Sequence, residues 1–332
     1  MKILITGCFG FIGYNFLKKL NEEYLDDFDI SGIDSLNNPY SKLNYEKFKG
    51  NINFEFHEAD IVNINEIDFQ SKEFDLIINF AAESHVDTSI YNPNVFIESN
   101  ILGVNNILKF CLNNSVKSFI QISTDEVYGS AKDEFFAESD ILNPSSPYSA
   151  SKAGADMICN SYRKTYGLKV KTIRPANNYG PFQQPEKLIP FSISNIVEQK
   201  EVEIYGDGEN VRHWLYVKDT VDGILAIIEK GKDGEVYNIG SGIYYNNNEL
   251  ALKLLSRFEL GEKSIKYVED RPGHDFKYAI NFDKLKALDW QPKYEFENAL
   301  DETVSWYLDN QNWWNKGIKQ VRENRELRFN KK

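Results

Sequence analysis

Two residues of the sequence have the chemistry and the spacing that proton transfer requires. Tyr148 and Lys152 stand four residues apart, so they share one face of a helix that is expected to begin near Pro147. A lysine ammonium close to a phenol lowers the pKa of that phenol from about 10, so the tyrosinate can act as a base while a hydride leaves the same carbon. Because a Tyr-x-x-x-Lys pair often occurs by chance, its meaning depends on the elements around it.

A second group lies in STDEVYG (123–129), directly after a predicted strand. Thr124 can hydrogen-bond a substrate hydroxyl, and the adjacent carboxyl groups of Asp125 and Glu126 can reach neighbouring carbons of one substrate. Asp125 can act as an acid at neutral pH only if burial and the charge of Glu126 raise its pKa. The alternative interpretation is a solvated acidic loop.

The first strand is followed by TGCFGFIG, which predicts a phosphate-binding turn. Gly7, Gly10 and Gly13 allow a tight turn, a close approach to a pyrophosphate and close packing of the next helix on the sheet. Asp34 follows about 20 residues later, where a carboxylate accepts hydrogen bonds from a ribose and repels a 2′-phosphate. The sequence therefore favours NAD over NADP, with Asp60 as a candidate for the adenine pocket; a glycine-rich turn without ligand is the alternative.

The order of apolar segments predicts the fold class. Short apolar runs alternate with helical patterns, such as those at 94–113 and 147–166, which is typical of a doubly wound parallel sheet of the Rossmann type. We expect an NAD-binding domain over 1–175 and a smaller mixed α/β lobe for the substrate over 176–332, with some segments returning to the first domain. The expected strands are 2–6, 29–33, 52–56, 75–80, 118–123 and 169–174.

Composition excludes several classes of protein. The net charge of −12 over 332 residues makes nucleic acid an unlikely partner. Cys8, Cys111 and Cys159 are too scattered for a disulfide framework or a zinc site, so we expect a reducing cytoplasm and no metal. We see no signal peptide and no apolar run near the ~20 residues of a membrane span. The basic C-terminal stretch is interpreted as a solvated end.

Several longer motifs carry a resemblance that extends over nearly the whole chain. The sequence resembles the nucleotide-sugar enzymes of the extended short-chain dehydrogenase/reductase family, and most closely the dTDP-glucose 4,6-dehydratases within it. The motifs are AAESHVDTSI (81–90), STDEVYG, PYSASK, NNYGPFQQPEKLIP (177–190), DGENVRHWLYVKD (207–219), VYNIGSG (236–242), DRPGHDFKYAIN (270–281) and WYLDNQNWWN.

The resemblance implies a three-step reaction that returns NAD unchanged. Tyr148, assisted by Thr124 and Lys152, removes the C4 hydroxyl proton while hydride passes to NAD. Glu126 then abstracts the C5 proton as Asp125 protonates the departing C6 hydroxyl, and hydride returns to C6. The implied product is a 4-keto-6-deoxy sugar nucleotide.

The second lobe is expected to bind the nucleotide end of the substrate. Arg212 and Arg271 can form forked hydrogen bonds to a diphosphate, and Lys187 can add a point charge, although a single Arg is more often a solvated charge. By the resemblance, further substrate contacts are Ser84, Asn177, Leu188, Tyr205, Asn247 and His274. The expected cofactor contacts also include Phe11, Ile12, Ile61, Ala81, Ala82 and Asn178, the last on the nicotinamide side.

The sequence leaves several alternatives open. The thymine and uracil bases differ by one methyl group, worth about 1 kcal/mol of burial, so a UDP-glucose 4,6-dehydratase is the nearest alternative. A UDP-sugar 4-epimerase or decarboxylase is less favoured, because by the resemblance those families lack consecutive Asp125 and Glu126. A catalytically silent nucleotide-sugar-binding protein is the non-enzymatic alternative.

Two positions depart from the family pattern, and the predicted helices bear on assembly. His213 stands where an acid is usual, and Thr88 stands where an Arg is usual; both departures could alter anchoring or interface contacts. Apolar residues beyond one core stripe on the helices at 94–113 and 147–166 suit a two-fold interface, and the resemblance also implies a homodimer.

Overall fold

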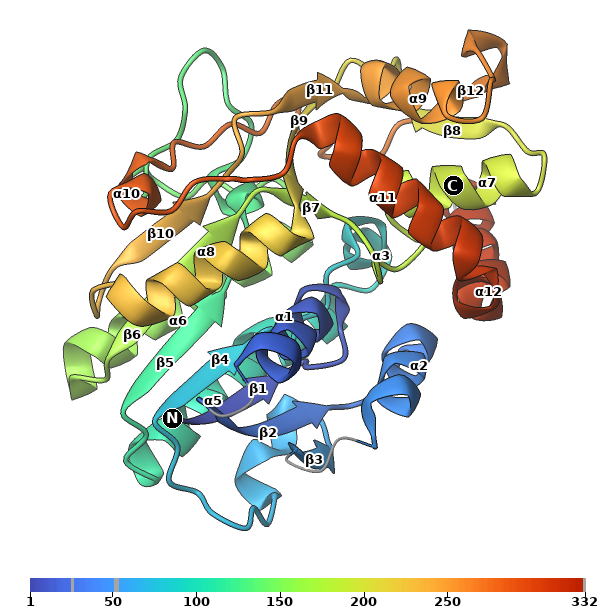
Figure 1. Ribbon diagram of the computed structural model, residues 1–332. Helices are drawn as coiled ribbons and strands as arrows, with labels where there is room; N and C mark the ends of the chain where they lie inside the picture. The colour runs from blue at the N-terminus through green and yellow to red at the C-terminus, as the bar shows by residue number, and fades with distance from the viewer. Residues whose placement is uncertain (25–26, 51–53, 331–332) are drawn as a thin grey trace.

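A seven-stranded parallel sheet runs through the middle of the molecule (Figure 1). The structure is a computed structural model that describes residues 1–24, 27–50 and 54–330, with side chains described as far as residue 325. The strand order is β10 (Val236–Ile239), β6 (Val170–Pro175), β5 (Ser118–Ile122), β4 (Leu76–Asn79), β1 (Lys2–Thr6), β2 (Asp29–Asp34), β3 (Phe54–Glu58).

Helices cover both faces of this sheet, so its central strands β1, β4 and β5 are almost completely buried. The helices are α1 (Phe11–Glu23), α2 (Pro39–Phe48), α3 (Val86–Tyr91), α4 (Pro93–Ile97), α5 (Val104–Asn113), α6 (Pro147–Tyr166), α7 (Leu188–Val197), α8 (Val217–Lys230), α9 (Asn247–Ser256), α10 (Asp283–Lys286), α11 (Phe296–Asp309) and α12 (Gln311–Asn330). The side chains of alternate residues of β1 point to opposite faces of the sheet. Ile3 and Ile5 pack with α1 and α8, and Leu4 packs with α5 and α6.

The predicted fold class is confirmed, and the elements differ from the prediction mainly at their ends. The strand expected over 52–56 begins at Phe54 within the described residues, and residues 52–53 lie outside them. The helix expected over 94–113 is divided into α4, a π-helical turn η2 (Glu98–Gly103) and α5.

The π-helical turn has a structural cause at Asn100. The Asn100 Oδ1 atom accepts from the Glu83 backbone N–H at 2.9 Å, and its Nδ2 atom donates to the Glu83 carbonyl at 3.0 Å and to Ser151 Oγ at 2.8 Å. The wider turn thus ties the chain after β4 to helix α6, and such turns are often found at functional sites.

The second half of the chain divides its elements between the central sheet and a smaller lobe. β10 pairs in parallel with β6, and α8 packs against α1, so both belong to the central layers. The smaller lobe holds a three-stranded sheet and a two-stranded sheet beside α7 and α9 (Figure 1). Their strands are β7 (Asn177–Tyr179), β9 (Val211–Tyr216) and β11 (Tyr244–Asn246), then β8 (Val202–Tyr205) and β12 (Ile265–Val268).

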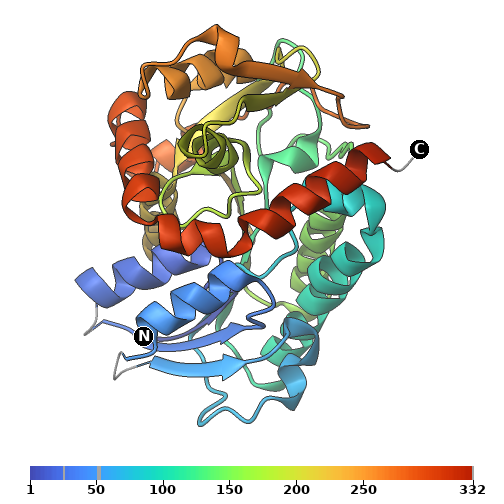
Figure 2. The same cartoon turned by 90° about the vertical axis from the view of Figure 1, so that its right-hand side faces the viewer.

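Helix α12 begins against α2 of the first domain and runs on to the smaller lobe (Figure 2). Trp313 Nε1 donates to Asn44 Oδ1 at 3.0 Å, which fixes the start of α12 on α2. Arg322 and Arg325 then form ion pairs with glutamates of the smaller lobe, the latter at 3.4 Å from Glu203. The interpretation of this basic stretch as a solvated end is therefore wrong for Arg322 and Arg325, because both guanidinium groups have carboxylate partners. Lys316 and Lys319 of the same stretch are exposed, as expected.

The expectation that no apolar run approaches the length of a membrane span is wrong for one helical run. Pro93–Asn113 spans 21 residues and is long and apolar enough to cross a membrane, although 44% of its most apolar 18-residue stretch is buried inside the fold. A core helix of a globular protein passes the same test, and this run packs against α6. The three cysteines are free and buried.

Candidate functional site

A cavity of about 680 Å³ lies at the carboxyl ends of β1, β2 and β4, where ligands of doubly wound sheets bind. Ser84 lines this cavity too, although a substrate contact was predicted for it. Seven of the residues predicted to contact the cofactor line it: Gly7, Gly10, Asp34, Asp60, Ile61, Ala81 and Ala82.

Close backbone contacts explain why the turn after β1 needs glycine. Gly7 has φ +64°, and a Cβ there would lie 2.5 Å from the Ala81 backbone nitrogen. A Cβ on Gly13 would lie 2.3 Å from the Gly7 carbonyl oxygen. Side chains at these positions would disrupt the turn that delivers the N-terminus of α1 to the cavity, so the cradle fits a pyrophosphate. Phe11 and Ile12 instead pack against the core.

Asp34 is held in position by two backbone donors. Its Oδ2 atom accepts from the Phe9 N–H at 2.9 Å, and its Oδ1 atom accepts from the Leu36 N–H at 3.0 Å. Burial raises the pKa of Asp34, and these hydrogen bonds oppose that shift. A carboxylate has further lone pairs, so Asp34 can still accept from ribose hydroxyls.

The turn after β5 brings the predicted catalytic residues together. Thr124 caps the short helix η3 (Asp125–Tyr128): its Oγ1 atom accepts from the Glu126 N–H at 3.2 Å and donates to Asp125 Oδ1 at 3.4 Å. Thr124 also hydrogen-bonds to Tyr148. The predicted acid and phenol are therefore buried next to the predicted base Glu126, which is partly buried.

A buried ion pair supports this turn from below. Arg174 Nη1 donates to Tyr128 Oη at 2.7 Å, and its Nε donates to Asp156 Oδ2 at 2.9 Å. Both charged side chains are almost completely buried, and breaking such a pair costs about 3–5 kcal/mol. The ion pair therefore stabilises the position of the turn.

The environments of the two adjacent carboxyl groups differ. Burial first, and then the charge of Glu126, raises the pKa of Asp125 well above its ordinary value. Burial also raises the pKa of Glu126, but Arg271, Lys187 and Arg212 oppose that shift. Asp125 Oδ2 has no hydrogen-bond partner among the described residues. Such divergent environments suit a protonated acid beside an ionised base.

The expected effect of Lys152 on Tyr148 is wrong for the protein without ligands. Burial, followed by the charge of Glu126, raises the pKa of Tyr148. Lys152 Nζ donates to the Ile122 carbonyl at 2.7 Å, and burial lowers the pKa of Lys152 to about 8. The phenol therefore faces two carboxyl groups, which disfavour its ionised form.

A second cavity lies beside the first and holds most of the predicted substrate residues. His85 lines both cavities, so they meet at its side chain. Asn178 lines this second cavity rather than the dinucleotide cavity, and Thr220 donates to its amide oxygen at 2.5 Å. The predicted substrate residues that line it are Asn177, Lys187, Leu188, Tyr205, Arg212, Asn247, Arg271 and His274.

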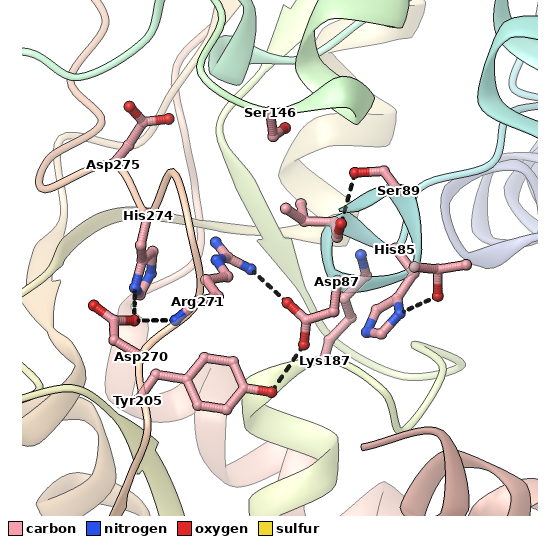
Figure 3. Close-up of polar contacts among 12 residues, drawn as sticks. His85, Asp87, Ser89, Ser146, Lys187, Tyr205, Asp270, Arg271, His274 and Asp275 are labelled. Atoms are coloured by element: carbon pink, nitrogen blue, oxygen red, sulfur yellow. Dashed lines mark hydrogen bonds and ion pairs between the residues drawn. The ribbon is translucent and has the colours of Figure 1, made fainter. Parts of the chain in front are cut away.

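Asp87 was missed by the sequence reasoning and organises this cavity (Figure 3). Its carboxylate accepts from Tyr205 Oη at 2.9 Å and lies 3.4 Å from Arg271 Nη1. His274 Nδ1 lies 2.6 Å from Asp270 Oδ1, which also accepts from the Arg271 N–H. Asp87 belongs to AAESHVDTSI, so its motif was visible but its partners were not.

Comparison with known proteins identifies the family of this fold and site. The model of the GDP-mannose 4,6 dehydratase family matches residues 4–303. The chain belongs to this family. Among curated proteins it is 43% identical to the low-salt glycan biosynthesis protein Agl12 of Haloferax volcanii, covering 93% of this chain and 99% of that protein. It is 39% identical to the dTDP-glucose 4,6-dehydratase of Streptomyces antibioticus, covering 95% of this chain and 94% of that protein.

Solved structures agree with this family membership. DesIV, the dTDP-glucose 4,6-dehydratase of Streptomyces venezuelae solved with NAD and TYD bound, is 38% identical. It superposes with a TM-score of 0.90 over 95% of this chain and 99% of its own.

Both departures from the family pattern have local partners. His213 Nε2 accepts from the backbone N–H groups of Ser241 and Gly242, both at 2.8 Å, as a carboxylate oxygen would. Burial lowers the pKa of His213 to about 3, so the ring is neutral. Thr88 Oγ1 lies 2.8 Å from His85 Nδ1. The part of the chain that the structure describes contains no group of three or more His, Cys, Asp or Glu that could hold a metal ion.

The turn after β1 generates the first prediction. In Gly13→Ala the new Cβ must displace the Gly7 carbonyl, so the affinity for NAD+ should fall at least tenfold, about 1.4 kcal/mol, in calorimetric titration. Gly261→Ala is the matched control, because a Cβ there has nothing within 4 Å. Equal affinities of both variants would contradict the proposed cradle.

Proposed function

We propose that this protein is an NAD-dependent dTDP-glucose 4,6-dehydratase that converts dTDP-glucose to dTDP-4-keto-6-deoxyglucose. The observation that carries the proposal is the pair of adjacent carboxyl groups beside Tyr148, Asp125 buried and Glu126 partly buried. Elimination of water needs an acid and a base on adjacent carbons, whereas epimerisation needs neither. The relatives named dTDP-glucose 4,6-dehydratase support the same reaction.

The residues divide the proton transfers between them. Tyr148 accepts the C4 hydroxyl proton, with Thr124 as its hydrogen-bond partner and Lys152 one helical turn away. Because the pKa of Tyr148 is raised without ligands, ionisation of the phenol must accompany binding. Bound NAD would supply the hydride acceptor for C4 and the hydride donor for C6. The Gly7 turn and Asp34 are the groups that would hold it.

Elimination uses the two adjacent carboxyl groups in opposite roles. Oxidation at C4 acidifies the C5 hydrogen, which Glu126 removes as a base. Asp125 then protonates the departing C6 hydroxyl through its unpartnered buried Oδ2 atom. The raised pKa of Asp125 favours the protonated form that this step requires.

The second cavity suits the nucleotide diphosphate. Arg212, Arg271 and Lys187 bring three cations to it, and guanidinium groups bind phosphate oxygens with forked geometry. We assign residues 1–175 mainly to the dinucleotide and 176–332 mainly to the sugar nucleotide, in a cytoplasmic enzyme. The preference for dTDP over UDP follows the names of the relatives and the sequence motifs.

Product analysis tests the reaction itself. Incubation with dTDP-glucose should give a 4-keto sugar nucleotide that has lost its C6 hydroxyl, detected by NMR, and UDP-glucose should react more slowly. Recovery of dTDP-galactose would indicate an epimerase. Binding of NAD and dTDP-glucose without any product would indicate a catalytically silent protein.

Variants of the carboxyl pair test the assigned roles. Asp125→Asn and Glu126→Gln should each slow elimination about 100-fold or more while leaving C4 oxidation, followed by NADH absorbance, far less affected. Asp133→Asn and Glu134→Gln are matched controls, because they form a second consecutive Asp-Glu pair that is exposed. Equal loss of C4 oxidation in both active-site variants would count against these roles.

We propose that the protein forms a homodimer through α4, η2 and α6. Large apolar side chains are exposed on this face, including Ile97 at 52%, Leu102 at 44% and Met157 at 52%. Sedimentation equilibrium should give a dimer for the wild type and a shift toward monomer for Met157→Glu. Leu260→Glu, at an exposed leucine elsewhere, should remain dimeric, and a monomeric wild type would refute the interface.

A further inference from the structure

Tyr278 contacts Glu126, the base of the elimination step, and is not itself one of the residues that transfer protons. Its side chain is only 3% exposed and lines the substrate cavity. The Tyr278 Oη atom lies 3.5 Å from Glu126 Oε2 and 2.9 Å from Asp275 Oδ2. One phenol hydroxyl thus stands between two carboxyl groups.

Neighbouring residues hold both the Tyr278 ring and the Asp275 carboxylate in place. The Arg212 guanidinium stacks over the Tyr278 ring at 4.4 Å, and its Nη2 donates to the Asp275 carbonyl at 3.0 Å. Ser145 Oγ donates to Asp275 Oδ1 at 2.7 Å. Figure 3 shows Asp275 next to His274, on the segment that also carries Arg271. The position of the phenol oxygen is therefore set by packing rather than by its hydrogen bonds alone.

A phenol has a single proton and can donate it to one carboxyl group at a time. The shorter distance places this proton on the Asp275 side in the protein without substrate. When Glu126 is ionised and faces a substrate, its Oε2 atom competes for the same donor. After Glu126 has taken a proton, it can itself donate to Tyr278 Oη while Tyr278 donates to Asp275.

We propose that Tyr278 is a positioning residue whose hydroxyl donates a hydrogen bond to ionised Glu126 before C5 deprotonation. Afterwards the same hydroxyl donates its hydrogen bond to Asp275 again. No proton is transferred in this exchange, because only the hydrogen bond changes its acceptor. This inference rests on the proposed function, and it adds to that function a hydrogen bond that favours the ionised form of Glu126.

Other charges also act on Glu126 and must be considered in any pH experiment. Burial is the main cause that raises its pKa, and Asp275 acts in the same direction. The titratable and charged groups around the site are Asp125, Tyr148, Lys187, Arg212, Arg271, Asp275 and Tyr278. Among these groups in the described part of the chain, Arg212 bonds the Asp275 backbone carbonyl, and only Tyr278 is hydrogen-bonded to the Asp275 carboxylate. Removal of the Tyr278 hydroxyl therefore has a distinct effect on the pH profile.

The test is the pH profile of C5 deprotonation in Tyr278→Phe, measured as deuterium incorporation from solvent at C5. Loss of the donor should move the acidic limb, where Glu126 must ionise, to higher pH and slow deprotonation about tenfold at neutral pH. C4 oxidation, followed as NADH absorbance in a single turnover, should change less than twofold. Phe keeps the ring under Arg212, and Tyr179→Phe, which also removes one buried hydroxyl, should leave the limb unmoved.

A second variant predicts the opposite shift. Asp275→Asn removes a negative charge and frees Tyr278 to donate to Glu126, so the acidic limb should move to lower pH. In the double variant with Tyr278→Phe this shift should be smaller, because part of it acts through the phenol. An unmoved limb in Tyr278→Phe, or equal loss of C4 oxidation, overturns the inference, whereas a wild type that makes no dehydrated product refutes the proposed function.

Discussion

The site depends on two adjacent carboxyl groups on one short turn, Asp125 buried and Glu126 partly buried. Burial raises the pKa of both Asp125 and Glu126, and two adjacent negative charges in such a place would strongly repel each other. The protein resolves this conflict by asymmetry. Arg271, Lys187 and Arg212 favour the ionised form of Glu126, and the charge of Glu126 then favours the protonated form of Asp125. The acid and the base thus define each other.

The parallel sheet supplies the positions that this asymmetry needs. The carboxyl ends of β1, β2, β4 and β5 face one edge, so the glycine turn, Asp34 and the carboxyl pair come from separate strands yet lie near one another. The cations come from the smaller lobe and approach from the other side. In the proposed function, this arrangement separates the dinucleotide from the diphosphate of the substrate, with the carboxyl pair between them.

The sequence predicted the parts of the structure that depend on local patterns. The strand at 2–6 and the helix over 147–166 appear with the expected bounds, because apolar periodicity and the Ser146 cap define them locally. The π-helical turn was not predictable, because it depends on hydrogen bonds from Asn100 to Glu83 and Ser151. The motifs contain the residues that the structure brings together in the turn after β5 and most of the residues that line the second cavity.

Effects that depend on distant partners were missed. The direction of the Tyr148 pKa shift depends on the carboxyl groups that face it and on the Ile122 carbonyl that engages Lys152. The roles of Asp87 and Tyr278 depend on contacts between segments more than 100 residues apart. Spacing along the chain contains no information about such contacts.

Helix α12 has a consequence for the order in which the protein becomes competent. Gly317, Gln320 and Asn324 line the dinucleotide cavity, and Arg325 lines the substrate cavity with its guanidinium 4.9 Å from the Tyr205 ring. Neither cavity has its full wall until this segment has left the ribosome. We therefore expect that either ligand is bound in a complete site only after α12 has packed across the two cavities.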